Sequence, residues 1–213
     1  ACLNVAVGAG ALEDNTTGAR NSALGRYALA CNTTATCNTA IGYTAMYNNT
    51  TGDNNTAIGN KALCCNTTAG LNTAIGACTL VANTTGTQNT AIGMNSMVAN
   101  TFGHNNTSSG YRALSENTTG CRNTAIGACT LDDNTTGNIN TAVGFMSLVN
   151  ATTAGSNTGV GVQVLYTNTT GHNNTASGNY AMYKNTTGCF NTASGTVSLY
   201  GNTTGCFNVG YGR

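Results

Sequence analysis

The chain contains no proline and no tryptophan, and charged residues make up only 6% of its 213 positions, with a formal net charge of +1. This composition lacks the charge of a disordered tail and the basic surplus of a nucleic-acid-binding protein. No apolar run approaches the roughly 18 residues of a membrane-spanning helix. The sequence therefore predicts no nucleic-acid partner and no membrane insertion.

Signatures of catalysis and of metal binding are also missing. The cysteines and histidines do not have zinc-site spacing, and the chain has no calcium nonapeptide, phosphate-binding loop or nucleophile elbow. Asp132 and Asp133 are adjacent carboxylates, which we interpret as a solvated edge. We therefore expect no enzyme activity, no cofactor, and neither a catalytic nor a metal site.

The chain does contain a 17-residue repeat that runs through it without insertion or deletion. Asn recurs at every seventeenth position from 4 to 208, and Gly follows four residues after each of these Asn residues. We number the repeat in columns from this Asn, so that residues 38–54, NTAIGYTAMYNNTTGDN, form one unit. Because a gapless repeat makes every segment equivalent to its neighbours, it is typical of a solenoid. We expect a single repeat domain over residues 1–213.

The constant columns predict an all-β fold. Seventeen residues are too few for a pair of helices with turns, and the constant segments are punctuated by Gly and Asn-Thr, which favour turns. We expect a parallel β-solenoid (a β-helix or β-roll) of about twelve coils without caps. In each coil, NTAIG would form one strand, columns 7–10 a second strand, and NTTG a corner.

The charged residues indicate which columns face water. All of them lie in columns 6, 7, 10, 11, 16 and 17, and charged side chains are rarely buried. Columns 4 and 9 each carry an aliphatic residue in most units, such as Ile58 and Leu63. We therefore predict that columns 4 and 9 form the buried core and that the six variable columns are mostly exposed.

Ten cysteines in a chain of this length are typical of an extracellular protein. Cys189 and Cys206 share column 16 in successive units, at a spacing within disulfide range. Cys31 and Cys37 bracket one corner, and Cys2 also lies in column 16. We regard these five residues as disulfide candidates, within or between chains. The alternative is that free cysteines pack as small hydrophobes.

The two ends of the sequence have the same phase in the repeat. A solenoid without caps presents open strand edges, and a head-to-tail contact that does not close produces a filament. We therefore predict that copies of the chain join head to tail, with Cys2 linked to Cys206 or Cys189 of the neighbouring copy. The alternative is a fragment of a longer array. The expected joining residues are Cys2, Leu3, Asn4, Val5, Cys206, Phe207, Asn208 and Val209.

Tyrosines form a ladder in column 10, where Tyr166, Tyr183 and Tyr200 occupy three successive units. Exposed aromatic ladders suit contacts with proteins or sugars, which makes surface glycans a candidate partner. The alternative is that the rings simply stabilise the stack of coils.

The Asn-Thr-Thr of columns 12–14 creates an N-glycosylation sequon in most units. Glycans about 4.8 Å apart would collide, so we interpret this motif as a structural corner. Sequons in the variable columns are the better candidates for glycosylation. They begin at Asn48, Asn54, Asn105, Asn150 and Asn173.

Units such as NTAIGNKALCCNTTAGL (55–71) and NTAIGACTLDDNTTGNI (123–139) resemble the NTAxGxxAL…NTTG repeats of bacterial secreted surface proteins and phage tail fibres. They are more distantly similar to the β-roll heads of trimeric autotransporter adhesins. The resemblance covers the whole chain. It implies a fibrous role at the cell surface or in the extracellular space.

We therefore expect a structural subunit of an extracellular filament or surface fibre that assembles head to tail. One alternative is a host- or carbohydrate-binding adhesin or tail-fibre segment, built as a trimeric β-roll. Another is an ice-binding solenoid, for which column 2 supplies one rank of Thr. Its neighbour on the same face, column 4, is mostly Ile and supplies no second Thr rank.

Overall fold

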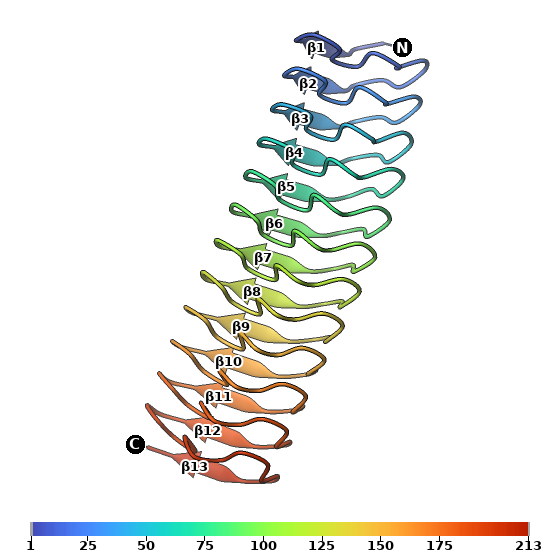
Figure 1. The fold of residues 1–213 in the computed structure, drawn as a ribbon. Helices are drawn as coiled ribbons and strands as arrows, with labels where there is room; N and C mark the ends of the chain where they lie inside the picture. The colour runs from blue at the N-terminus through green and yellow to red at the C-terminus, as the bar shows by residue number, and fades with distance from the viewer. Residues whose placement is uncertain (1, 213) are drawn as a thin grey trace. The chain divides into compact units, whose positions relative to one another are not determined.

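The computed structural model describes residues 2–212, which contain thirteen short strands and no helix (Figure 1). None of these residues therefore belongs to a helix that could cross a membrane. Each strand has three residues and covers columns 2–4 of one repeat unit. The strands are β1 (Val5–Val7), β2 (Ser22–Leu24), β3 (Thr39–Ile41), β4 (Thr56–Ile58), β5 (Thr73–Ile75), β6 (Thr90–Ile92), β7 (Thr107–Ser109), β8 (Thr124–Ile126), β9 (Thr141–Val143), β10 (Thr158–Val160), β11 (Thr175–Ser177), β12 (Thr192–Ser194) and β13 (Val209–Tyr211).

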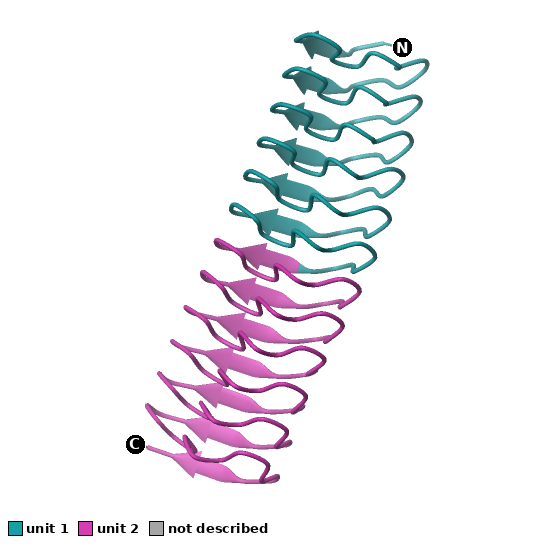
Figure 2. Ribbon diagram, in the orientation of Figure 1, with its two compact units in different colours: residues 1–106 teal, residues 107–213 magenta. Residues whose placement is uncertain are grey.

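The chain divides into two compact units, residues 1–106 with β1–β6 and residues 107–213 with β7–β13 (Figure 2). Within each unit, every strand pairs in parallel with the next strand along the chain. The register places each residue beside its equivalent in the next coil, as Thr39 beside Thr56 and Ile41 beside Ile58. Each unit is thus a parallel β-solenoid of 17-residue coils, and the predicted fold class is confirmed.

The rest of each coil consists of turns and bends, so the predicted second strand in columns 7–10 is wrong. Columns 7 and 9 have positive φ angles, 56° at Lys61 and 52° at Leu63 in one coil, which no β-strand can adopt. Backbone hydrogen bonds still join successive coils here, because the Leu29 N–H donates to the Ala45 carbonyl at 3.0 Å. The side opposite the sheet is therefore a stack of turns.

Glycine in column 5 ends each strand. At Gly59, φ is 139°, a region that is open mainly to glycine. A Cβ at this position would also meet the Gly76 carbonyl oxygen of the next coil. The column is Gly because both the backbone conformation and the spacing between coils exclude a side chain.

The core contains column 9 but not column 4. Leu63 in column 9 is 0% exposed, whereas Ile41 and Ile126 in column 4 are 37% and 43% exposed. The prediction that column 4 lies in the core is therefore wrong. Column 3 is buried, as at Ala40, and successive side chains of a strand point to opposite faces. With column 3 inside, columns 2 and 4 must face outward.

Buried asparagine fills the space that a second aliphatic column was expected to fill. In column 1, the Asn38 backbone N–H donates to Asn21 Oδ1 at 3.0 Å, and Asn38 Nδ2 donates to the Gly52 carbonyl at 2.9 Å. The pattern repeats along both units. Because these amides have partners from coil to coil, they can be buried without the cost of unpaired polar groups.

Column 12 forms a second buried Asn ladder, which one coil interrupts. Asn66 Nδ2 donates to Asn49 Oδ1 at 2.7 Å and to the Ala69 carbonyl at 2.9 Å. Position 151 in this column is Ala, and the buried Oδ1 of Asn134, one coil earlier, has no hydrogen-bond partner. The Asn-Thr-Thr motif is therefore a corner that the hydrogen bonds of its buried Asn side chain stabilise.

Candidate interaction surfaces

In each unit, the outer face of the sheet displays columns 2 and 4. In the first unit, Thr56 lies beside Thr73 and Ile58 beside Ile75, so one rank of hydroxyls runs alongside one rank of aliphatic side chains. No charged residue occupies either column. An uncharged face with a repeated exposed aliphatic residue is unusual on a monomer and indicates an interaction surface.

This face differs between the two units. In the first unit, column 4 is aliphatic in every strand, from β1 to β6. In the second, Ile or Val occupies it in β8, β9 and β10, and Ser occupies it in β7, β11 and β12. The sequence interpretation missed this surface. The small residue in column 3, which is Ala in most units, was the signal that could have shown it. A strand column that faces the interior turns its two neighbouring columns outward.

The tyrosine ladder is present in the second unit. The rings of Tyr166 and Tyr183 stack with centroids 4.9 Å apart and planes 6° apart, and Tyr183 and Tyr200 stack at 5.3 Å and 7°. Desolvation between its neighbours raises the pKa of the Tyr183 phenol. A sugar that stacks on an aromatic ring needs a free ring face, and both faces of Tyr183 are covered. The ladder therefore offers mainly ring edges.

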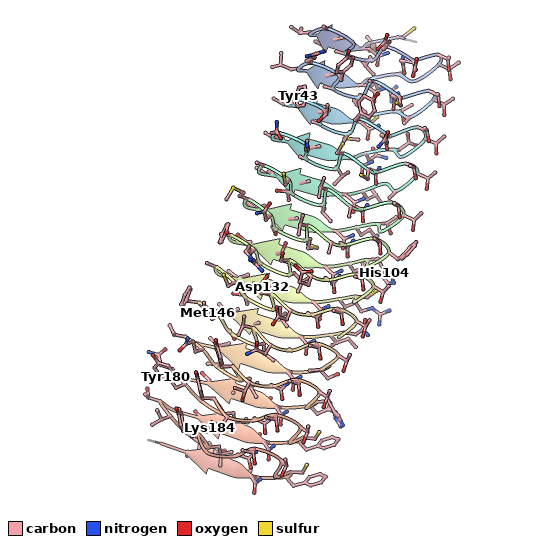
Figure 3. The ribbon with its side chains drawn as sticks, in the orientation of Figure 1. Tyr43, His104, Asp132, Met146, Tyr180 and Lys184 are labelled. Atoms are coloured by element: carbon pink, nitrogen blue, oxygen red, sulfur yellow. The ribbon has the colours of Figure 1, made fainter. Side chains whose placement is uncertain are left out.

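Side chains at the ends of the coils point outward in Figure 3. Tyr43 lies on the side where the strand of its coil ends, and His104 lies on the opposite side of its own coil. The Nδ1 atom of His104 is 2.9 Å from Nδ2 of its neighbour Asn105. Among residues 2–212, no group of three or more His, Cys, Asp or Glu side chains is placed to hold a metal ion.

The disulfide candidates are free thiols in the structure. Cys189 and Cys206 lie together as their shared column predicts, because the Cys189 N–H donates to Cys206 Sγ at 3.2 Å. Cys31 is half-buried, and desolvation raises the pKa of its thiol. Cys2 and Cys37 are exposed. Disulfide formation at any of these positions stays a prediction.

The candidate glycosylation sites differ in accessibility. The column 12 asparagines between Asn32 and Asn185 are buried, which keeps their sequons out of reach in the folded chain. In the variable columns, Asn54, Asn105 and Asn173 are exposed, whereas Asn48 and Asn150 are half-buried. The first three are therefore the more accessible acceptors.

The residues predicted to join subunits fall into two groups. The first is exposed and includes Leu3 at 78% and Phe207 at 76%, with Cys2, Val5, Cys206 and Val209. The second consists of Asn4 and Asn208, which are half-buried members of the column 1 ladder. Their contact with another copy stays a prediction.

One ion pair joins two neighbouring coils of the second unit. Arg112 Nη2 lies 3.1 Å from Asp132 Oδ2, and Asp132 is 7% exposed. Desolvation raises the pKa of Asp132, and the Arg112 cation opposes that shift. This carboxylate is engaged in a structural contact. It is not the solvated edge that the sequence suggested.

Comparison of the chain with protein-family models, with curated proteins and with solved structures finds no match. The interpretation of its function therefore rests on the solenoid itself and on the surfaces described above.

Proposed function

We propose that this chain is a structural segment of an extracellular filament or surface fibre. The observation that carries the proposal is the repeated contact between successive coils within each unit, made of backbone hydrogen bonds, the Asn ladders of columns 1 and 12, and a Leu or Met in column 9 of each coil. The next coil makes the same contact whether it belongs to the same chain or to another copy. A contact of this head-to-tail kind does not close and extends into a filament.

The sheet face supplies a second route for self-association. Aliphatic side chains in column 4 of β2–β6 lie on a face without charge, exposed in all of these strands except β4, where Ile58 is half-buried, and burial of apolar surface stabilises association. A second copy carries ranks with the same spacing between coils, so two such faces can match along their length. The abundance of cysteine supports an extracellular location.

The test measures assembly of the full-length chain by electron microscopy and by sedimentation velocity over a range of concentrations, with and without reductant. We expect filaments or large oligomers for the unmodified chain. A triple variant, Ile41→Lys, Ile58→Lys and Ile75→Lys, adds charge to the sheet face and is expected to lose side-by-side association. The matched control, Thr34→Lys, Asn60→Lys and Gln88→Lys, adds the same charge at other exposed positions and is expected to assemble normally.

A wholly monomeric chain at every concentration would reject the fibre proposal. Assembly that survives the Ile triple variant unchanged would reject the sheet face as a contact and leave head-to-tail extension in place. Loss of large oligomers on adding reductant would point to disulfides between copies.

Ice binding is a second candidate, and one observation favours it. Columns 2 and 4 both face outward, in registered ranks of Thr and of Ile or Val on an uncharged surface. Thermal hysteresis of the full chain, compared with that of the Ile triple variant, would separate this function from self-association. The covered ring faces of the Tyr ladder give the carbohydrate-binding alternative a weaker basis.

A further inference from the structure

Cys189 and Cys206 hold equivalent places in two successive coils. Cys189 Sγ donates to the Thr187 carbonyl at 3.1 Å and accepts the His172 N–H at 3.4 Å. Cys206 Sγ donates to the Thr204 carbonyl at 3.6 Å and accepts the Cys189 N–H at 3.2 Å. Because both thiols have the same surroundings, their sulfur atoms are separated by about one coil, or about 4.8 Å.

This separation suits a bridging ion better than a direct bond. A disulfide has sulfurs about 2.05 Å apart, so both side chains would have to leave their hydrogen bonds. A metal–thiolate bond is about 2.3 Å long, as in zinc sites, and a linear sulfur–metal–sulfur unit therefore spans about 4.6 Å. The two thiols can hold such an ion with little movement.

We propose that Cys189 and Cys206 form a two-thiolate site for one soft monovalent metal ion of the Cu(I) class. Thiolates select soft ions such as Cu(I), which accept two ligands in a line. Zinc needs four ligands, and the described residues offer no group of three or more ligating side chains. His172, one coil earlier, packs edge-on against Phe190 at 5.3 Å, and its Nδ1 is 2.8 Å from Asn173 Nδ2.

Binding changes protonation but not oxidation state. Each thiol releases one proton, and the ion joins the two sulfurs in an anionic bis-thiolate with a net charge of −1. The hydrogen bonds that the thiols donate to the Thr carbonyls are lost. The two backbone N–H groups that donate to the sulfurs, from His172 and Cys189, can remain in place. This site does not rest on the proposed fibre function, although Cys206 cannot hold the ion and form a disulfide with another copy at the same time.

Cys121 provides a matched single thiol in the same unit. It lies in column 16, and its Sγ donates to the Thr119 carbonyl at 3.1 Å, as Cys189 does to Thr187. Its N–H donates to Asn138 Oδ1 of the next coil at 2.7 Å, so an amide stands where Cys206 stands for Cys189. Cys121 therefore has the same local surroundings but no second sulfur in the following coil.

The experiment titrates the reduced, full-length chain with Cu(I), buffered by a chelator under anaerobic conditions, and then alkylates the free thiols. Trypsin releases residues 185–213, which contain both Cys189 and Cys206, and residues 113–122, which contain only Cys121. We expect Cys189 and Cys206 to become protected together, at a free Cu(I) concentration at least about a hundredfold below that for Cys121, because the second thiol binds intramolecularly.

The variants test whether the two sulfurs act as one site. C206S should expose Cys189 to alkylation, C189S should expose Cys206, and C121S should leave the protection of the pair unchanged. Serine keeps a donor for the Thr carbonyls, and circular dichroism checks that each variant is folded. The proposal is overturned if Cys189 stays protected in C206S, if the pair is protected only together with Cys121, or if X-ray absorption finds more than two sulfurs around copper.

Discussion

Columns 4 and 9 carry the same kind of residue, but column 4 faces outward from the coil and column 9 faces its interior. Both supply one aliphatic side chain in most repeats, as Ile58 and Leu63 do in a single coil. Leu63 is fully buried among its equivalents, whereas the column 4 rank forms the outer face of the sheet. Hydrophobicity alone therefore does not identify the interior of a narrow solenoid.

The backbone explains the difference. Column 4 is in a strand next to buried Ala in column 3, so alternation turns it outward. Column 9 is in a stack of turns, where Leu63 has a φ of 52° and follows buried Ala62. Here two successive residues both face inward, which a strand cannot achieve. Ser177 and Ser194 in column 4 are consistent with this, because a hydroxyl on the outer face costs little.

The largest expected effect comes from placing the same charge in both columns of one coil. Leu63→Asp buries an unpaired carboxylate and should cost more than about 4 kcal/mol of unfolding free energy. Ile58→Asp places its carboxylate on the half-buried outer face of the sheet, where water can reach it, and should cost about 1 kcal/mol or less. Urea unfolding followed by circular dichroism, at concentrations too low for assembly, measures both values. Equal losses in the two variants would contradict the assignment of the two faces.

The contacts between coils could be predicted from the 17-residue period of the sequence. The unbroken period predicted the parallel, in-register stacking and therefore the neighbours of every residue, including the Tyr166 ladder and the position of Cys189 beside Cys206. The position of column 9 inside followed as well. These features depend only on which residues are equivalent, and the repeat shows that directly.

The conformation within a coil was harder to predict. Residues such as Lys61, Leu63 and Thr44 adopt positive φ angles that their side chains do not favour. The residue types therefore do not indicate this conformation, and columns 7–10 were expected to form a strand. The buried Asn ladders depend on the repeat, because a single Asn is usually exposed. Stacking of identical amides removes the cost of burying the Asn side chain, because each amide then has hydrogen-bond partners one coil away.

In the buried Asn ladder of column 12, one substitution can remove an Asn and another can add one. Asn66→Ala should cost about 1–3 kcal/mol, because it removes the donor to Asn49 Oδ1 within the buried ladder. Ala151→Asn should do the reverse and stabilise the second unit by about 1 kcal/mol, because it supplies a donor to the unpartnered Oδ1 of Asn134. Both values come from the same urea-unfolding measurement.

A control for the second substitution is Ala154→Asn, which places the same side chain at a different buried Ala of that coil. This variant should be destabilised, because a larger side chain would have to fit at a fully buried position beside the Asn140 amide, which donates to the Ala154 carbonyl at 2.8 Å. A loss of stability in Ala151→Asn comparable to that of the control would contradict the prediction that Asn at position 151 completes the ladder.

The smallest expected effect concerns Asp132, a column 10 residue that is buried although its column was expected to face water. Desolvation raises its pKa, so the folded chain binds this proton more tightly than the unfolded chain does. The stability that this contributes is present at low pH and is lost as pH rises through the raised pKa. Relative to the unmodified chain, Asp132→Asn should therefore gain stability as the pH rises from the acid range towards neutral.

Arg112 allows the cause to be checked. Its cation opposes the shift, so Arg112→Ala should raise the pKa of Asp132 further and move the loss of stability to higher pH. Asp133→Asn is the opposite case, because the Asp133 carboxylate also raises the pKa of Asp132, and its removal should therefore lower that pKa. Melting temperatures measured across this pH range give all three comparisons. If the melting temperatures of the unmodified chain and of Asp132→Asn change with pH in the same way, the Asp132 carboxyl titrates as an exposed group does. That result would contradict the burial of Asp132.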